Sequence, residues 1–261
     1  MGAEEPARPV IRDSRFFDRW YADMAASPTR DAIWAHALGL PPELGSSGLL
    51  PWRGIADVAE ALRLWPGGLL LDLACGRGGY GIEVARRTGA RLLGVDFSEV
   101  ALERARRSGA RMLPAGRSRF QAGTLAATGL PDGIADGLMC VDAVQFAEPP
   151  LAAMLEFRRL LVPGGRVALT CWELAPGPAD DRVPARLHAV HLQRDLTEAG
   201  FTCVQVRERA DWREAERALW QEALEAPAGD DEAIKSAQSE GRRSLDTFGS
   251  VRRVFATATA P

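Results

Sequence analysis

Hydrophobic positions in the central part of the chain alternate between short apolar runs and longer segments of helical periodicity. The run 69–73 is apolar apart from one aspartate, which is typical of a strand buried on both faces of a sheet. A helical pattern follows to about residue 88, and the alternation then repeats. Further strands are predicted at 91–96, 119–122, 137–141 and 166–172, with helices over roughly 98–108 and 150–161. This order predicts an α/β fold with a mainly parallel sheet covered by helices on both faces.

Both ends of the chain depart from this alternation. Residues 1–12 are polar and contain prolines, so we expect a frayed start. Residues 13–45 combine helical spacing with turns and many aromatic side chains, and a short amphipathic helix is expected over roughly 53–64. The final third predicts a helix at 185–199, a strand at 202–207, a long helical segment at about 211–244 and a strand at 251–259. Two strands separated by helices predict an antiparallel terminal pair with a cap between them.

These patterns divide the chain into two parts. Residues 1–52 are interpreted as an N-terminal helical lid segment. Residues 53–261 are interpreted as the core, with a helical cap inserted at about 211–248.

Composition excludes several classes of function. The 261 residues carry 35 acidic and 32 basic side chains, a balance that argues against nucleic-acid binding through a concentrated basic face. No apolar stretch predicts a membrane span or a signal peptide. The four cysteines are widely spaced, which favours reduced, mostly buried thiols and a cytoplasmic protein. The three histidines are too few and too scattered for a zinc cluster, so no metal is expected.

A glycine-rich loop directly after the first predicted strand carries the strongest chemical signal. Gly76, Gly78 and Gly81 allow a sharp turn, close approach of a ligand and the start of a helix whose N-terminus favours an electron-rich group. Asp96 follows Gly76 by twenty residues, at the end of the second strand, where a carboxylate accepts hydrogen bonds from a ribose. This spacing alone also fits a site for NAD.

Three features favour S-adenosylmethionine (SAM) over NAD. Asp72 lies on the strand before the loop, where it would suit the ammonium group of an amino-acid moiety and not a pyrophosphate. The turn Pro163-Gly164-Gly165 leads into a strand, and the terminal strand pair is the third feature. A dehydrogenase of the Tyr-x-x-x-Lys type is also disfavoured, because Lys235 in the predicted cap is the only lysine.

Residues 69–172 resemble the core of the class I SAM-dependent methyltransferases, the Rossmann-like group with a seven-stranded sheet. The resemblance rests on five successive segments: 72–81, 94–98, 120–125, 130–143 and the Pro-Gly-Gly turn. The flanking segments resemble small-molecule methyltransferases, including those of bacterial natural-product pathways. The resemblance therefore implies methyl transfer to an O, N or C atom of a small molecule, with S-adenosylhomocysteine (SAH) as the product.

The resemblance also implies a set of cofactor-binding residues. They are Asp72, Ala74, Gly76, Arg77, Gly78, Gly81, Asp96, Phe97, Ser98, Gly123, Thr124, Leu125, Val141, Asp142 and Phe146. The family often carries an acid where Thr124 stands, so a hydroxyl must replace it beside the adenine amino group. The family also often has a His pair where this chain has Gln145-Phe146, so no histidine base comes from that loop.

Candidate substrate and catalytic residues come from outside the glycine loop. Trp172 is expected at the carboxyl edge of the sheet, where ligands bind in open α/β folds. The resemblance implies that the N-terminal segment covers the cofactor, and with the cap it could line a substrate pocket. The predicted substrate residues are Tyr21, Trp34, Trp52, Gln145, Trp172 and Trp220. Candidates for a general base are His36, Asp142 and His188. Two alternatives remain open at this point: a SAM-binding partner subunit without activity, and an NAD-dependent oxidoreductase. We expect a monomer or a homodimer.

Overall fold

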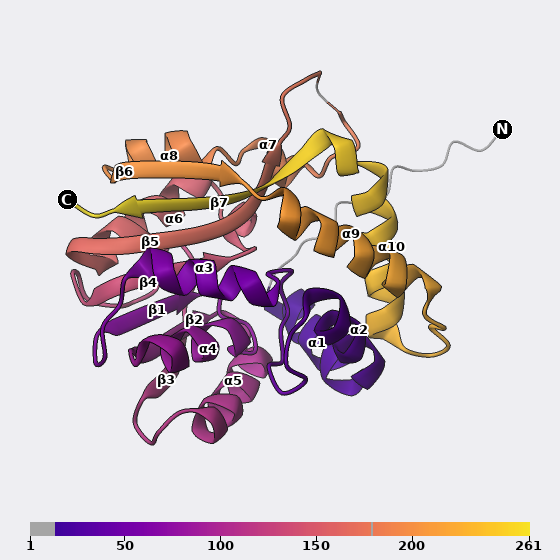
Figure 1. Ribbon diagram of the computed structural model, residues 1–261, viewed down its shortest axis with the longest axis horizontal. Coiled ribbons are helices and arrows are strands. Elements are labelled where there is room, and N and C mark those ends of the chain that lie inside the picture. The colour runs from indigo at the N-terminus through magenta and orange to yellow at the C-terminus, as the bar shows by residue number, and fades with distance from the viewer. Residues whose placement is uncertain (1–13, 179) are drawn as a thin grey trace.

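Residues 14–178 and 180–261 are described by a computed structural model (Figure 1). The predicted frayed start, residues 1–12, and the first part of the predicted lid lie outside these ranges. Seven strands form one sheet in the order β3-β2-β1-β4-β5-β7-β6. The strands are β1 (Leu69–Leu73), β2 (Arg91–Asp96), β3 (Ser118–Ala122), β4 (Ala135–Val141), β5 (Leu161–Leu174), β6 (Thr202–Glu208) and β7 (Val251–Thr259).

The direction of the strands confirms the predicted topology. β1 to β5 run parallel to one another, and β7 pairs antiparallel with both β5 and β6. The strand order reverses between β1 and β4, and open α/β sheets bind ligands outside the carboxyl ends of strands at such a point.

Helices cover both faces of the sheet. One face carries α3 (Trp52–Leu62), α4 (Gly79–Thr88) and α5 (Glu99–Met112), and the other carries α6 (Pro150–Leu160) and α8 (Leu192–Glu198). Each face has its own apolar core, because the central strands present side chains to both: Leu70 packs with the α3 side and Leu71 with the α6 side. This arrangement makes the inner strands apolar throughout, as the sequence pattern predicted.

Four further helices gather beyond the carboxyl ends of the parallel strands (Figure 1). They are α1 (Ser14–Ala26), α2 (Pro28–Leu38), α9 (Ala210–Glu225) and α10 (Glu232–Asp246). α9 packs against both α2 and α10, and α1 packs against α10 and α5. Segments from the two ends of the chain therefore lie together at the edge of the sheet where ligands are expected.

Two predicted helices are each divided in the structure. The long segment 211–244 consists of α9 and α10, because Pro227 and Gly229, the latter with φ +47°, interrupt the helix. The segment 185–199 consists of α7 (Ala185–His188) and α8, with His191 as the N-cap of the second helix. In both cases the type of structure was predicted and the turn was missed.

The described part of the chain contains no helix with the length and apolar composition that a membrane span requires.

Candidate active site

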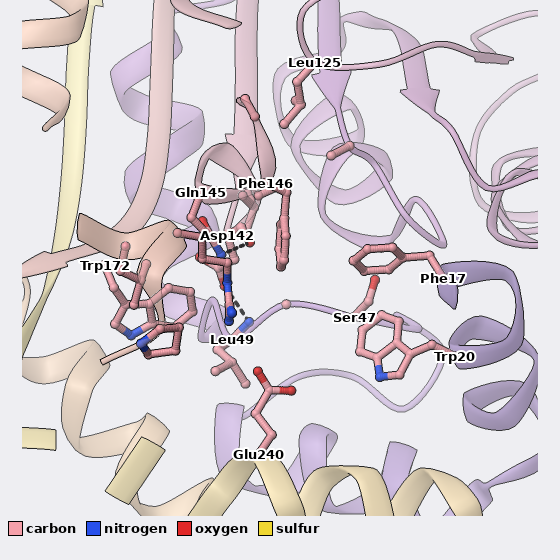
Figure 2. Close-up of a pocket in the computed structure, with 18 of the residues that line it drawn as sticks. Phe17, Trp20, Ser47, Leu49, Leu125, Asp142, Gln145, Phe146, Trp172 and Glu240 are labelled. Carbon is pink, nitrogen blue, oxygen red and sulfur yellow. Dashed lines mark hydrogen bonds between the residues drawn. The ribbon is translucent and has the colours of Figure 1, made fainter. Parts of the chain in front are cut away.

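A cavity of about 740 Å³ lies at the carboxyl edge of the sheet, among the four gathered helices. Its walls come from α1, α2, α9 and α10 on one side, and from the loops that follow β2, β3, β4 and β5 on the other. Figure 2 shows Phe17 and Trp20 on one side of this space, Trp172 on the other and Phe146 between them.

Most of the predicted ligand-binding residues line this cavity. From the predicted cofactor set, the lining includes Ala74, Asp96, Phe97, Gly123, Thr124, Leu125, Val141, Asp142 and Phe146. From the predicted substrate set, it includes Tyr21, Trp34, Gln145, Trp172 and Trp220. Residues far apart in the sequence thus share one cavity, although their individual roles stay predictions.

Other predicted residues do not reach the cavity lining. Among the cofactor set these are Asp72, Gly76, Arg77, Gly78, Gly81 and Ser98, which lie in or behind the glycine loop and at the start of α5. Trp52 begins α3 outside the cavity, with the guanidinium of Arg87 4.2 Å from its ring centre. A substrate role for Trp52 has no support from this placement.

The histidine candidates lie away from the cavity. His36 is exposed on α2, where its Nδ1 lies 2.9 Å from Glu222, and that carboxylate raises the pKa of the imidazole. His188 ends α7, with its Nε2 3.3 Å from the carbonyl oxygen of Val183. Neither imidazole is placed to act as a base on a ligand in the cavity.

Left-handed backbone conformations shape the glycine loop. Gly76 and Gly78 have φ angles of +53° and +81°, which only glycine adopts at little cost. A Cβ on Gly76 would lie 2.5 Å from the Ser47 hydroxyl and 2.8 Å from the Tyr21 hydroxyl. The N-terminal segment therefore packs directly on the loop, and this contact requires the absence of a side chain at position 76.

Arg77 holds this segment on the loop. Its guanidinium donates to both carboxylate oxygens of Asp31 on α2, at 2.7 and 2.8 Å, and to the carbonyl oxygen of Ser46 at 2.6 Å. Arg30 donates to the same carbonyl oxygen at 2.6 Å. The Arg77 side chain thus faces the N-terminal segment, which leaves its backbone as the part available to a cofactor.

Asp96 ends β2 at the cavity wall. Its Oδ2 accepts a hydrogen bond from the Gly76 N–H at 2.8 Å, and its Oδ1 accepts one from the Ser98 N–H at 2.9 Å. Burial raises the pKa of this carboxyl despite these donors. Each oxygen retains a further lone pair, so the group fits the predicted task of accepting hydrogen bonds from a ribose.

Asp72 lies on β1 and does not reach the cavity lining, unlike Asp96. The residue is buried against Gly81, where an added Cβ would lie 2.4 Å from the carboxylate. Burial and the nearby charge of Asp96 raise its pKa to about 8. This shift favours the protonated carboxyl in the cofactor-free protein, whereas a cationic group bound nearby would favour the ionised form.

Asp142 follows β4 with a left-handed φ of +59° and is part of a buried network. Its Oδ1 accepts from the Arg253 guanidinium and the Thr170 hydroxyl, each at 2.5 Å, and its Oδ2 accepts from the Leu49 N–H at 2.7 Å. These three donors occupy the carboxylate. Asp142 is thus better suited to joining β4, β7 and the N-terminal segment than to removing a proton.

Sequence reasoning missed Arg253 and Glu216. Arg253 interrupts the apolar strand β7 and stacks its guanidinium 3.8 Å from the ring centre of Trp172. Glu216 lines the cavity and accepts from the indole N–H of Trp172 at 2.9 Å and from that of Trp220 at 3.4 Å. Each of the two is a charged residue on an otherwise apolar face, and this was the available signal. On α9, Glu216 follows Trp212 by four residues and precedes Leu219 by three, which places the three on one face of the helix.

The described residues contain no group of three or more histidine, cysteine or acidic side chains placed to hold a metal ion. Cys75, Cys140 and Cys171 are buried as expected, and Cys203 is exposed on the edge strand β6.

Comparisons with known proteins agree with this arrangement. A family model described as a methyltransferase domain matches residues 70–165. An O-methyltransferase from Pyrenophora dematioidea is 27% identical over 169 residues, which cover 60% of this chain and 63% of that protein. A ribosomal protein L11 methyltransferase from Thermus thermophilus is 34% identical over 158 residues, 60% of this chain and 55% of that protein. The chain thus spans less than two thirds of either relative.

Solved structures match over nearly the whole chain. The [4+2]-cyclase SpnF has a TM-score of 0.77 at 22% identity, covering 97% of this chain and 98% of that one. Phosphoethanolamine N-methyltransferase 2 of Haemonchus contortus, in complex with phosphomonomethylethanolamine and SAH, has a TM-score of 0.77 at 18% identity, covering 97% of this chain and 61% of that one. At these identities the likeness shows the fold. With the sheet order, it shows that the chain has the Rossmann-like fold of the class I SAM-dependent methyltransferases, and the matched domain model shows that residues 70–165 are similar to a methyltransferase domain.

Proposed function

We propose that this protein binds SAM and transfers its methyl group to a small molecule enclosed in the cavity. The observation that carries the proposal is one cavity that is lined by Asp96 and Phe97 at the end of β2 and also by Trp172 and Glu216. Figure 2 shows part of this lining. A nucleoside and a second molecule would both fit along such a space, whose volume is within the range of small-molecule sites.

The residues at the β2 side fit the nucleoside part of SAM. Asp96 offers carboxylate oxygens to the ribose, and Phe97 and Leu125 offer apolar surfaces to the adenine. Gly76 and Gly78 would lie under the methionine part, with Asp72 beneath its ammonium group. Tyr21 and Ser47 lie over Gly76, so the N-terminal segment and the methionine part would share this face of the loop.

SAM supplies a methyl group already activated by the positive sulfur, and the chain supplies alignment. With SAM bound, the methyl group would pass to a nucleophilic atom of the substrate as the carbon–sulfur bond breaks, and SAH would be the leaving group. Holding two reactants in the correct relative position lowers the activation free energy by on the order of 7–11 kcal/mol. The buried aromatic walls, among them Phe17 and Trp34, exclude water from the reaction. No step requires Asp142 to leave its ion pair with Arg253.

The helices above the cavity favour a small substrate over a protein or nucleic acid. We propose that α1 and α2 act as the lid, and α9 and α10 as the cap, over the core that begins near residue 53. The relatives matched at similar coverage are named as an O-methyltransferase and a ribosomal protein L11 methyltransferase, so the comparisons do not choose the substrate. We propose a small metabolite, such as a secondary metabolite, because helices from both ends of the chain line the cavity. The buried thiols favour a reducing compartment such as the cytoplasm.

A turnover screen tests the proposal. The purified protein is incubated with SAM and individual small metabolites, and SAH formation is measured against an Asp96→Ala control. We expect SAH above the substrate-free rate for a subset of the metabolites, and little SAH with the variant. SAM binding without any turnover, together with a stable complex with another protein in gel filtration, would favour a non-catalytic partner subunit.

A further inference from the structure

Two buried arginines share a single carboxylate beside the glycine loop. Arg30 and Arg77 both donate to the carbonyl oxygen of Ser46, each at 2.6 Å, and both form an ion pair with Asp31, at 3.1 and 2.7 Å. Their side chains are only 2% and 8% exposed, and no second acid in the described part of the chain bonds to either one. We call Arg30 and Arg77 the arginine pair. It carries one positive charge more than Asp31 neutralises.

Hydrogen-bond donors without acceptors accompany this excess charge. Nη2 of Arg30 and Nε of Arg77 are buried and have no partner among the described residues. The same holds for the indole N–H of Trp34, whose ring centre lies 3.7 Å from the guanidinium of Arg30. Burial lowers the pKa of Arg30 to about 9, and the charge of Arg77 adds to this shift. A buried charge without full compensation is costly unless an opposite charge lies close by, so the arginine pair favours an anion in its neighbourhood.

The segment 46–47 connects the arginine pair to the cavity. Ser47 follows the residue that both guanidiniums hold, and its hydroxyl lies over the glycine loop, 2.5 Å from where a Cβ on Gly76 would be. The Tyr21 hydroxyl lies 2.8 Å from the same point. Both Ser47 and Tyr21 line the cavity, and Figure 2 shows Ser47 in its wall. Two hydroxyl donors, with the arginine pair behind one of them, therefore face the space above Gly76.

Buried acids approach the same loop from the sheet. Asp72 lies on β1 and Asp96 ends β2, and Asp96 accepts from the Gly76 N–H at 2.8 Å. The strands thus supply negative charge to the loop, while α2 and the side chain of Arg77 supply positive charge on the side of the N-terminal segment. A zwitterion, with a cation and an anion a few bonds apart, matches this arrangement better than an amine or an acid alone.

We infer that the arginine pair is the counter-charge for the carboxylate of the amino-acid moiety of SAM, which accepts hydrogen bonds from the Ser47 and Tyr21 hydroxyls. The inference rests on the proposed function, because it assigns a subsite for the same cofactor. The guanidiniums act through the segment 46–47, so their role is to bind and orient the cofactor and not to touch the methyl group. A cofactor without its carboxylate would leave their charge uncompensated.

Calorimetry with two ligands that differ only in this group tests the inference. The protein is titrated with SAH and, separately, with decarboxylated SAH, S-adenosyl-3-thiopropylamine, which keeps the nucleoside, the sulfur and the amine. A hydrogen-bonded charge is at stake, so we expect SAH to bind at least about tenfold more tightly than the decarboxylated ligand. Equal affinities of the unmodified protein for the two ligands would overturn the inference.

Matched variants locate this preference on the arginine pair. Arg30→Gln keeps an N–H donor and removes the charge, while Asp31 stays paired with Arg77. The preference for SAH should shrink at least about threefold in this variant. Arg19→Gln removes the same charge from an exposed position on α1 and should keep the preference. Equal weakening of both ligands in Arg30→Gln would show a purely structural role for Arg30 and contradict the inference.

Tyr21→Phe provides a second variant that leaves the buried charges in place. It removes one hydroxyl above Gly76 and keeps the aromatic ring, so the preference for SAH should again shrink, and the melting temperature shows whether each variant is folded. An unchanged preference in folded Tyr21→Phe and Arg30→Gln contradicts the inference. Failure of the unmodified protein to bind SAH counts against the proposed function, whereas SAH binding without a preference over the decarboxylated ligand counts against the carboxylate subsite alone.

Discussion

Arg253 and Asp142 form a buried ion pair at 2.5 Å although 111 residues separate them in the sequence. Asp142 follows β4 and Arg253 lies in β7, so the pair ties the parallel part of the sheet to its antiparallel end. Leu49 also donates to Asp142, which brings the N-terminal segment to the same point. The floor of the cavity is therefore held by a charge network that spans most of the chain.

Loss of Arg253 should strongly destabilise the fold. Arg253→Met leaves the Asp142 charge buried without its partner, and breaking such a pair typically costs about 3–5 kcal/mol. The free energy of unfolding from urea denaturation measures this. Arg207→Met on the exposed edge strand β6 is the control, with an expected change below about 0.5 kcal/mol. Equal effects of the two substitutions would show that the ion pair has no special role.

The cofactor-free protein should become less stable as the pH rises, because the buried carboxyl of Asp72 then loses its proton. Its pKa is about 8 in the folded chain and near 3.8 when exposed, so the folded state binds the extra proton. This contribution to stability is fully present below about pH 4 and is lost as the pH rises through 8. Asp72→Asn, which has no proton to lose, should be more stable at pH 7 by up to about 4 kcal/mol.

The measurement is urea unfolding of both proteins at pH 5 and pH 8. The difference between wild type and Asp72→Asn should grow with pH. The variant should also bind SAM more weakly, because the proposed partner of the ammonium group is gone. A difference in stability that is the same at both pH values would place the wild-type pKa near its usual value.

A methyl group on the glycine loop should disturb the N-terminal segment. In Gly76→Ala the new Cβ would lie within 3 Å of the Ser47 and Tyr21 hydroxyls. Gly133→Ala is a matched control, because its φ of +58° is similar and nothing lies within 4 Å of its Cβ. Both variants carry backbone strain of about 1 kcal/mol. We expect only Gly76→Ala to accelerate limited proteolysis of residues 14–48, and equal digestion rates would contradict the packing described.

Removal of the Asp96 carboxylate should weaken SAM binding. Asp96→Ala loses a charged hydrogen-bond acceptor, which is worth about 1.5–3 kcal/mol. Titration calorimetry measures the affinity, and the melting temperature shows whether the loop still folds, since Gly76 and Ser98 donate to this group. Asp132→Ala on the exposed loop before β4 is the control. Unchanged SAM affinity in Asp96→Ala would remove this residue from the site.

Local sequence patterns predicted the sheet because its strands are buried runs with a strong signal. The apolar runs of β1, β2 and β4 can be recognised from a few neighbouring residues. The same is true of the glycine loop and the Pro-Gly-Gly turn, because each depends on local backbone geometry. The carboxyl-edge location of Trp172 followed from the direction of its strand. Asp72, the Pro-Gly-Gly turn and the terminal strand pair favoured SAM over NAD, and the family resemblance then implied a seven-stranded sheet.

The missed features depend on contacts between distant segments. Arg253 meets Asp142 only when β7 enters the sheet, and Glu216 meets Trp172 only when α9 folds back over β5. Trp52 was expected in the pocket because it is aromatic and close to the lid in sequence, yet helix α3 directs it toward Arg87. Composition reveals such side chains, but only tertiary packing decides which cavity they line.

Calorimetric titration of the unmodified protein with SAM and, separately, with NAD tests the central claim most directly. We expect saturable one-to-one binding of SAM and of SAH, with no heat from NAD. Binding of NAD together with no detectable heat at millimolar SAM would contradict the cofactor, and with it the proposed methyl transfer.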